Sequence, residues 1–101
     1  MTTDAVVEKS SKTSDRIKLP KKYKVVLIND DVTPVEFVIA MLMDIFKHSQ
    51  PAAKEITLKV HNEGSAVAGI YTYEIAEQKT MEGVALARAN NFPLQLKCEV
   101  E

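Results

Sequence analysis

The chain has 101 residues, of which 46% are hydrophobic and 27% are charged, a balance typical of one globular domain. Its single cysteine excludes an internal disulfide and a cysteine-based metal cage, and no apolar run approaches the ~20 residues that a membrane span needs. The net charge of −1 divides into +3 over residues 1–22 and −4 over the remainder, which argues against a nucleic-acid-binding face.

Residues 1–20 show neither a strand period nor a helix period, so we expect a flexible N-terminal extension followed by a core domain over residues 21–101. The first residues lack the apolar core of a secretory signal. The expected location is therefore the cytoplasm, or the plastid stroma if the source is a photosynthetic eukaryote.

The first ordered element is a strand over residues 23–28, which are mostly β-branched or apolar. Asn29, Asp30 and Asp31 then favour a turn. Thr33 as N-cap, with Pro34 and a glutamate after it, predicts a capping box and a helix over residues 34–47. Because that helix is apolar on nearly every face, we expect it to lie between the sheet and another element.

The second half of the chain alternates helices with strands. Pro51 predicts the start of a second helix that ends before Gly64, and residues 66–71 predict a strand. Thr72 is expected to cap a third helix reaching about residue 90, with a last strand over residues 94–100. The order β-α-α-β-α-β predicts an α+β fold, a two-layer sandwich with three helices on one face of a three-stranded antiparallel sheet.

Few residues are candidates for chemistry. The acidic turn suits a cation better than an anion, but it lacks the long loop that calcium needs, and it is equally consistent with a purely structural turn. His61, at the end of an apolar helical stripe, is either a half-buried structural residue or a polar group at the rim of an apolar pocket. Because no catalytic, zinc or nucleotide-binding pattern occurs, we expect no enzymatic activity, no metal and no cofactor.

Four segments together resemble one protein family. The run NDDVTPVEFV at residues 29–38 is similar to the NDDxTPMEFV signature of ClpS, the adaptor of bacterial Clp proteases. Residues 60–64 resemble its VHxxG element, residues 73–79 its xEVAExK segment, and residues 92–94 its hPL segment. The resemblance extends from Tyr23 to about Glu99 without gaps, and the unpatterned tail matches the variable extension of the family.

The resemblance implies a fold and a function. The fold would be like that of the C-terminal domain of the ribosomal stalk protein, and a monomer is expected. The protein would bind substrates whose first residue is Leu, Phe, Tyr or Trp, and would deliver them to an AAA+ unfoldase of the ClpA or ClpC type. The alternative is a different interaction module on the same fold, which recruits partners as the ribosomal stalk does.

The resemblance also assigns roles to individual residues. The residues expected to meet the α-ammonium and the first peptide unit are Asn29, Asp30, Asp31 and His61. The residues expected to form the side-chain pocket are Thr33, Val35, Val38, Thr57, Val60 and Leu94. Glu74 and Lys79 match positions that contact the unfoldase. Val35 and Thr57 are smaller than the residues usual in the family, so Ile and Val are added to the expected first residues.

Overall fold

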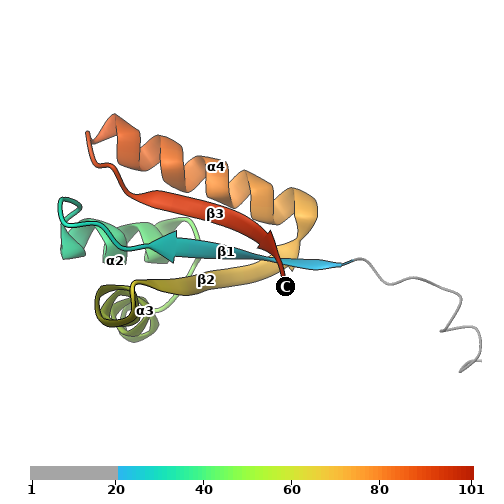
Figure 1. Cartoon of the computed structure of the whole chain (residues 1–101), viewed down its shortest axis with the longest axis horizontal. Coiled ribbons are helices and arrows are strands. Elements are labelled where there is room, and N and C mark those ends of the chain that lie inside the picture. Colours follow the sequence, from blue (N-terminus) through green and yellow to red (C-terminus); the bar gives the residue numbers. More distant parts are fainter. Residues whose placement is uncertain (1–20) are drawn as a thin grey trace, which may run out of the picture.

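Six elements follow one another in the predicted order, strand, helix, helix, strand, helix, strand (Figure 1). The computed structural model describes residues 21–101, and the flexible extension expected at residues 1–20 lies outside the described residues. The elements are β1 (Lys22–Ile28), α2 (Val35–Asp44), α3 (Gln50–Glu63), β2 (Ser65–Thr72), α4 (Tyr73–Ala89) and β3 (Gln95–Val100). The predicted α+β fold class is therefore confirmed.

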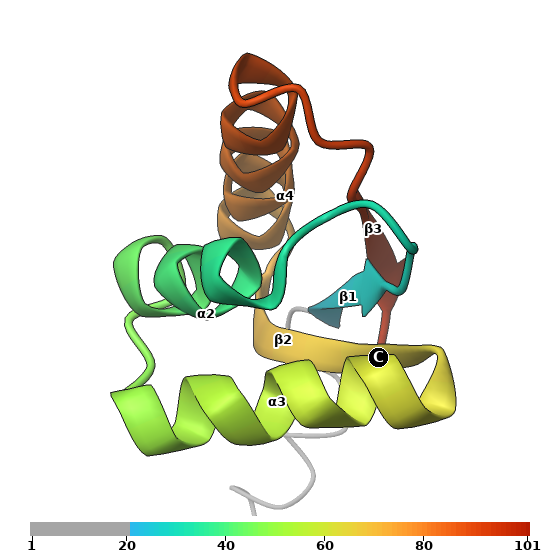
Figure 2. The same cartoon turned by 90° about the vertical axis from the view of Figure 1, so that its left-hand side faces the viewer.

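The three strands form one antiparallel sheet with the order β2-β1-β3. Helix α4 packs against all three strands, while α3 packs against β2 and α2 packs chiefly against α3. Figure 2 shows α2 and α3 lying side by side, with α4 above them. The buried side chains of the sheet come from alternate positions, because successive side chains of a strand point to opposite faces. They are Val25, Leu27, Ala66, Ala68 and Leu96.

A β-bulge interrupts the pairing of β1 with β2. Val25 pairs with Gly69 and Val26 with Val67, so Ala68 is the extra residue on β2. The carbonyl of Ala68 accepts a hydrogen bond from Nε2 of His48, which joins the α2–α3 connection to the sheet. His48 is half-buried by this contact.

The start and end of α2 differ from the sequence prediction. The N-cap residue is Pro34 rather than Thr33, and no side chain caps the helix. The prediction of a capping box is therefore wrong, because the Thr33 hydroxyl donates to the Asp30 carboxylate instead. The helix ends at Asp44 because Lys47 adopts a left-handed φ of 59°, and the N–H of His48 bonds back to the Leu42 carbonyl.

Helix α2 also buries only one stripe of its surface. Val38, Met41 and Leu42 are buried, but Val35 is 51% exposed and Met43 is 40% exposed. The expected position of this helix between the sheet and another element is thus wrong, because α2 packs chiefly against α3 and leaves part of its apolar surface exposed. Two other helix ends agree with prediction, since Pro51 lies in the first turn of α3 and Gly64 ends that helix with a φ of 92°.

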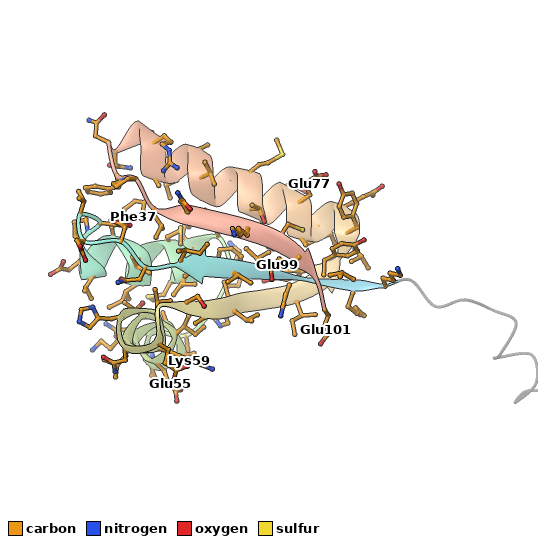
Figure 3. All side chains as sticks on the ribbon, in the orientation of Figure 1. Phe37, Glu55, Lys59, Glu77, Glu99 and Glu101 are labelled. Carbon is orange, nitrogen blue, oxygen red and sulfur yellow. The ribbon has the colours of Figure 1, made fainter. Side chains whose placement is uncertain are left out.

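The outer surfaces of the two longer helices carry charged side chains as well as exposed apolar ones such as Leu58 and Met81. Figure 3 shows Glu55 and Lys59 pointing outward from α3, and Glu77 pointing outward from α4. Both helices thus present charged and apolar side chains together to solvent.

Candidate functional site

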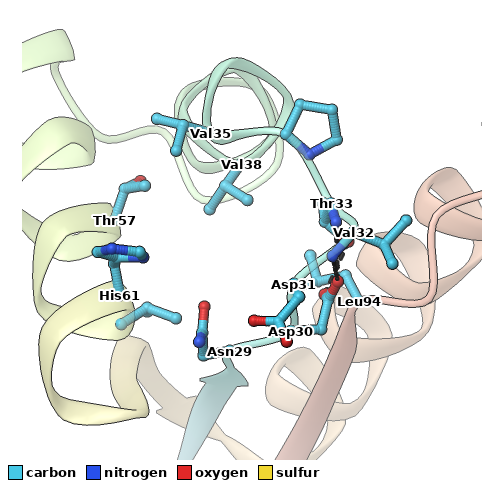
Figure 4. Close-up of a pocket in the computed structure, with 12 residues that line it drawn as sticks. Asn29, Asp30, Asp31, Val32, Thr33, Val35, Val38, Thr57, His61 and Leu94 are labelled. Atoms are coloured by element: carbon cyan, nitrogen blue, oxygen red, sulfur yellow. Dashed lines mark hydrogen bonds between the residues drawn. The ribbon is translucent and has the colours of Figure 1, made fainter.

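A cavity of about 430 Å³ lies where the end of β1, the first turn of α2 and the last turns of α3 meet (Figure 4). All ten residues that the sequence assigned to the ammonium site and the side-chain pocket line it, and Val32 and Pro34 line it as well. Residues separated by up to 65 positions in the sequence thus form one site. The lining residues are Asn29, Asp30, Asp31, Val32, Thr33, Pro34, Val35, Val38, Thr57, Val60, His61 and Leu94.

The Asp30 carboxylate organises the turn at the mouth of this cavity. Its Oδ1 accepts hydrogen bonds from the backbone N–H groups of Val32 and Thr33, both at 2.8 Å. Its Oδ2 accepts from the Thr33 hydroxyl at 2.7 Å. Partial burial alone would raise the pKa of Asp30, but these hydrogen bonds and the positive charge of Arg88 together hold that pKa below its ordinary value. Asp30 is therefore an anion at neutral pH.

Three more polar side chains surround the mouth. Asn29 is held by its backbone N–H, which donates to the Gly64 carbonyl at 2.9 Å at the end of α3. Only glycine adopts the left-handed conformation at that helix end without strain, so Gly64 lets the turn and the helix meet. Figure 4 shows the Asn29 amide and the His61 ring directed toward the cavity. With Asp31 beside Asp30, the mouth presents two carboxylates, one amide and one imidazole.

The walls below the mouth are apolar. Val38, Val60 and Leu94 are buried, and each is at most 6% exposed. Thr57 is also buried, but its hydroxyl donates to the Ala53 carbonyl one turn earlier, at 2.8 Å. The hydroxyl of Thr57 thus has a partner within its own helix, and this wall needs no hydrogen bond from a ligand.

Arg88 is a residue that sequence reasoning missed. Its Nη1 donates to the carbonyls of Phe92 and Leu94, both at 2.8 Å, and so holds the segment that carries the Leu94 wall. The ring of Phe92 packs edge-on against Phe37 of α2, with 4.9 Å between the ring centroids. A signal existed, because a basic residue in the last turn of a helix commonly bonds to the carbonyls that follow it.

The arrangement favours a ligand that is cationic at one end and apolar at the other. Carboxylates and a carbonyl acceptor at the mouth match an ammonium donor, and the walls match a hydrocarbon or aromatic group. Among residues 21–101, no group of three or more His, Cys, Asp or Glu side chains is arranged to hold a metal ion. Within the same part of the chain, no helix has both the length and the apolar character to cross a membrane.

The two residues assigned to unfoldase contact do not line the cavity. Glu74 is exposed in the first turn of α4. Lys79 is half-buried, and its Nζ donates to the Ile45 carbonyl at 2.8 Å, at the end of α2. The ammonium also lies 5.6 Å from the centroid of the Tyr71 ring. Lys79 thus has a structural contact that the sequence did not predict.

Comparison with known proteins identifies relatives over most of the chain. The profile of a family described as ATP-dependent Clp protease adaptor protein ClpS matches residues 18–97. The ATP-dependent Clp protease adapter protein ClpS of Treponema denticola is 45% identical over 91% of both chains. That of Campylobacter jejuni is 46% identical over 90% of this chain and 97% of its own.

A solved structure is also similar to this fold. It is that of Agrobacterium tumefaciens ClpS2 bound to L-phenylalaninamide, which superimposes with a TM-score of 0.80 at 40% identity. The similarity covers 82% of this chain and 100% of that protein. It therefore includes the whole order of helices and strands around the cavity.

Proposed function

Because the chain belongs to the ClpS family of Clp protease adaptors, which are not themselves proteases, we propose that it binds destabilising N-terminal residues of substrate proteins. The ligand would be a free α-amino group next to a large apolar first side chain. The adaptor would then deliver the bound protein to a Clp AAA+ unfoldase of the ClpA or ClpC type, and the proposed place of action is the cytoplasm.

In this proposal the mouth of the cavity binds the α-ammonium and the first peptide unit. The negative charge of Asp30 and Asp31 attracts the ammonium, the Asn29 carbonyl oxygen accepts a hydrogen bond from it, and a ring nitrogen of His61 accepts another. The walls, including Thr33 and Val35, enclose the side chain.

The observation that carries the proposal is the position of ionised Asp30 at the opening of an apolar cavity. The ligand of the similar A. tumefaciens protein supports it. L-phenylalaninamide combines a free α-amino group with a benzyl side chain, and it lacks the carboxylate that Asp30 and Asp31 would repel. Leu, Phe, Tyr and Trp are the first residues proposed, joined by Ile and Val because Val35 and Thr57 are small.

The test uses L-phenylalaninamide and its N-acetyl derivative, with binding measured by calorimetry. Acetylation removes the charged donor, and an unpaired charged acceptor costs roughly 1.5–3 kcal/mol, or about 10- to 150-fold in affinity. The Asp30→Ala and His61→Ala variants should each bind L-phenylalaninamide more weakly by a comparable factor. Asp44→Ala, at an exposed carboxylate outside the cavity lining, is the matched control and should bind like the wild type. Equal binding of the free and acetylated amides would contradict the proposal.

Delivery is proposed to involve Glu74, Lys79 and the N-terminal extension. All residues that line the cavity lie between Asn29 and Leu94, so deletion of residues 1–17 should change ligand affinity by less than about 0.5 kcal/mol. The same deletion should slow degradation of a Phe-starting protein by a reconstituted Clp unfoldase and protease. Unchanged degradation would refute the role of the extension without affecting the binding proposal.

A further inference from the structure

A second cavity, of about 400 Å³, opens beside the first between α2 and α3. Its surface is almost entirely apolar, and three of its lining residues, Val35, Thr57 and His61, also line the first cavity. Figure 4 shows Val35 and Thr57 facing each other from the two helices at the same side of the first cavity. One layer of side chains thus separates the two hollows.

The residues unique to the second cavity are Ile39, Lys54 and Leu58. Leu58 is 59% exposed and Val35 is 51% exposed, although both are large apolar side chains. Two such side chains on either side of one apolar groove, next to a proposed peptide site, are typical of a surface that a ligand covers. Lys54, the charged residue in this lining, places a positive charge at the groove.

We propose that this groove binds the side chain of the second residue of the same N-terminal segment, and that it selects large apolar residues at that position. The inference rests on the proposed function and adds a specificity that the first cavity does not supply. The positive charge of Lys54 disfavours Lys or Arg at the second position of the bound segment, because like charges repel.

The geometry of a peptide supports this occupant. Consecutive Cα atoms lie about 3.8 Å apart, so a first side chain in one cavity places the second residue within reach of the adjoining one. In an extended segment neighbouring side chains point in different directions. The second side chain therefore does not enter the first cavity, and the apolar surface next to it is the groove that shares Val35 and Thr57 with that cavity. The His61 ring, which borders both cavities, lies where the peptide passes from one to the other.

The experiment measures binding of fluorescent peptides Phe-Xaa-Ala-Ala by anisotropy, with Xaa as Gly, Leu or Lys. Leu should bind at least about fivefold more tightly than Gly, the effect of covering one to two methylene groups. Leu58→Ser should remove that preference while leaving the Gly peptide unchanged. Met81→Ser on α4, which alters an equally exposed apolar residue far from both cavities in the fold, is the matched control and should keep the preference.

Three outcomes would overturn the inference. These outcomes are equal binding of the three peptides, equal loss of the Gly and Leu peptides in Leu58→Ser, and a preference that follows Leu into the third position in Phe-Ala-Leu-Ala. Failure of the proposed function looks different, because N-acetylated Phe peptides would then bind as well as free ones. Since Leu58 is largely exposed, its substitution leaves the fold intact, and a thermal unfolding curve verifies this.

Discussion

The Thr33 hydroxyl donates a 2.7 Å hydrogen bond to the Asp30 carboxylate, while the N–H groups of Val32 and Thr33 donate to its other oxygen. A carboxylate offers about four lone-pair positions, so these three bonds leave about one for a ligand. In the proposed function, the contribution of Asp30 is therefore mainly its negative charge at a fixed point, and Asp31, Asn29 and His61 provide the remaining acceptors.

The first prediction is that Asp30 stabilises the fold in a pH-dependent way. Its pKa is lowered on folding, so its contribution is complete above the ordinary value of 3.8 and is lost as pH falls through the folded-state pKa. Asp30→Asn keeps the shape but removes the charge. The variant should be less stable than the wild type at about pH 6, by no more than about 1 kcal/mol because the carboxylate is only partly buried.

Urea unfolding at about pH 6 and about pH 3 measures this difference. Asp44→Asn, at an exposed carboxylate outside the cavity lining, is the control and should change stability at about pH 6 by less than about 0.5 kcal/mol. A gap between wild type and Asp30→Asn that stays constant with pH would show that the carboxylate charge is not what stabilises the turn.

The second prediction concerns the first residue of the ligand. Val35 lies on the boundary of the cavity and is 51% exposed, so Val35→Met adds bulk at the mouth without disturbing the core. A β-branched side chain is widest next to its Cα and is stiff at χ1, so it cannot avoid the added bulk. The binding free energy of Ile- and Val-starting peptides should fall by at least about 1 kcal/mol, the scale of overpacking, and that of Leu- and Phe-starting peptides should fall by less.

Fluorescence anisotropy with four peptides that differ only in residue one provides the measurement. Val67→Met, on a strand outside this cavity, is the matched control and should leave all four affinities unchanged. If Val35→Met weakened the four peptides equally, Val35 would not control access by β-branched side chains.

The third prediction concerns a close approach between α4 and β3. A Cβ added at Gly83 would lie 2.6 Å from Cδ2 of Leu96, a buried side chain. Alanine would improve helix propensity by about 1 kcal/mol, but overpacking costs about 1–3 kcal/mol. Gly83→Ala should therefore destabilise the wild type in denaturant unfolding. In a Leu96→Ala background, the Gly83→Ala change should instead raise the free energy of unfolding. A double-mutant cycle that shows no coupling between the two positions would disprove the contact.

The fourth prediction separates Glu74 from Lys79, which the proposed function pairs as unfoldase contacts. Lys79→Ala removes the hydrogen bond to the Ile45 carbonyl, so it should lower the free energy of unfolding by about 1 kcal/mol as well as weaken unfoldase binding. Glu74→Ala, at an exposed side chain, should weaken unfoldase binding with a stability change below about 0.5 kcal/mol. Equal stability of the two variants in thermal unfolding would contradict the structural role of Lys79.

Local signals in the sequence predicted most of the fold. The apolar run in β1, the alternation in β3, the proline in the first turn of α3 and the glycine at its end act over a few residues, so the sequence alone indicates them. The predicted cap of α2 was wrong because the Thr33 hydroxyl had two possible partners. Bonding to the charged Asp30 carboxylate is stronger than capping with a neutral backbone group.

The residues of the candidate site were named from the resemblance to the ClpS family, and the structure brings all ten of the proposed ammonium-site and pocket residues around one cavity. What the sequence determined by itself was the order of the elements and the presence of an acidic turn before an apolar helix. Only the tertiary structure decided that Arg88 holds the Leu94 segment, that Lys79 bonds to the end of α2, and that a second apolar groove adjoins the first. Those relationships depend on how separate helices pack against one another, and no local pattern of residues encodes the distance between two packed surfaces.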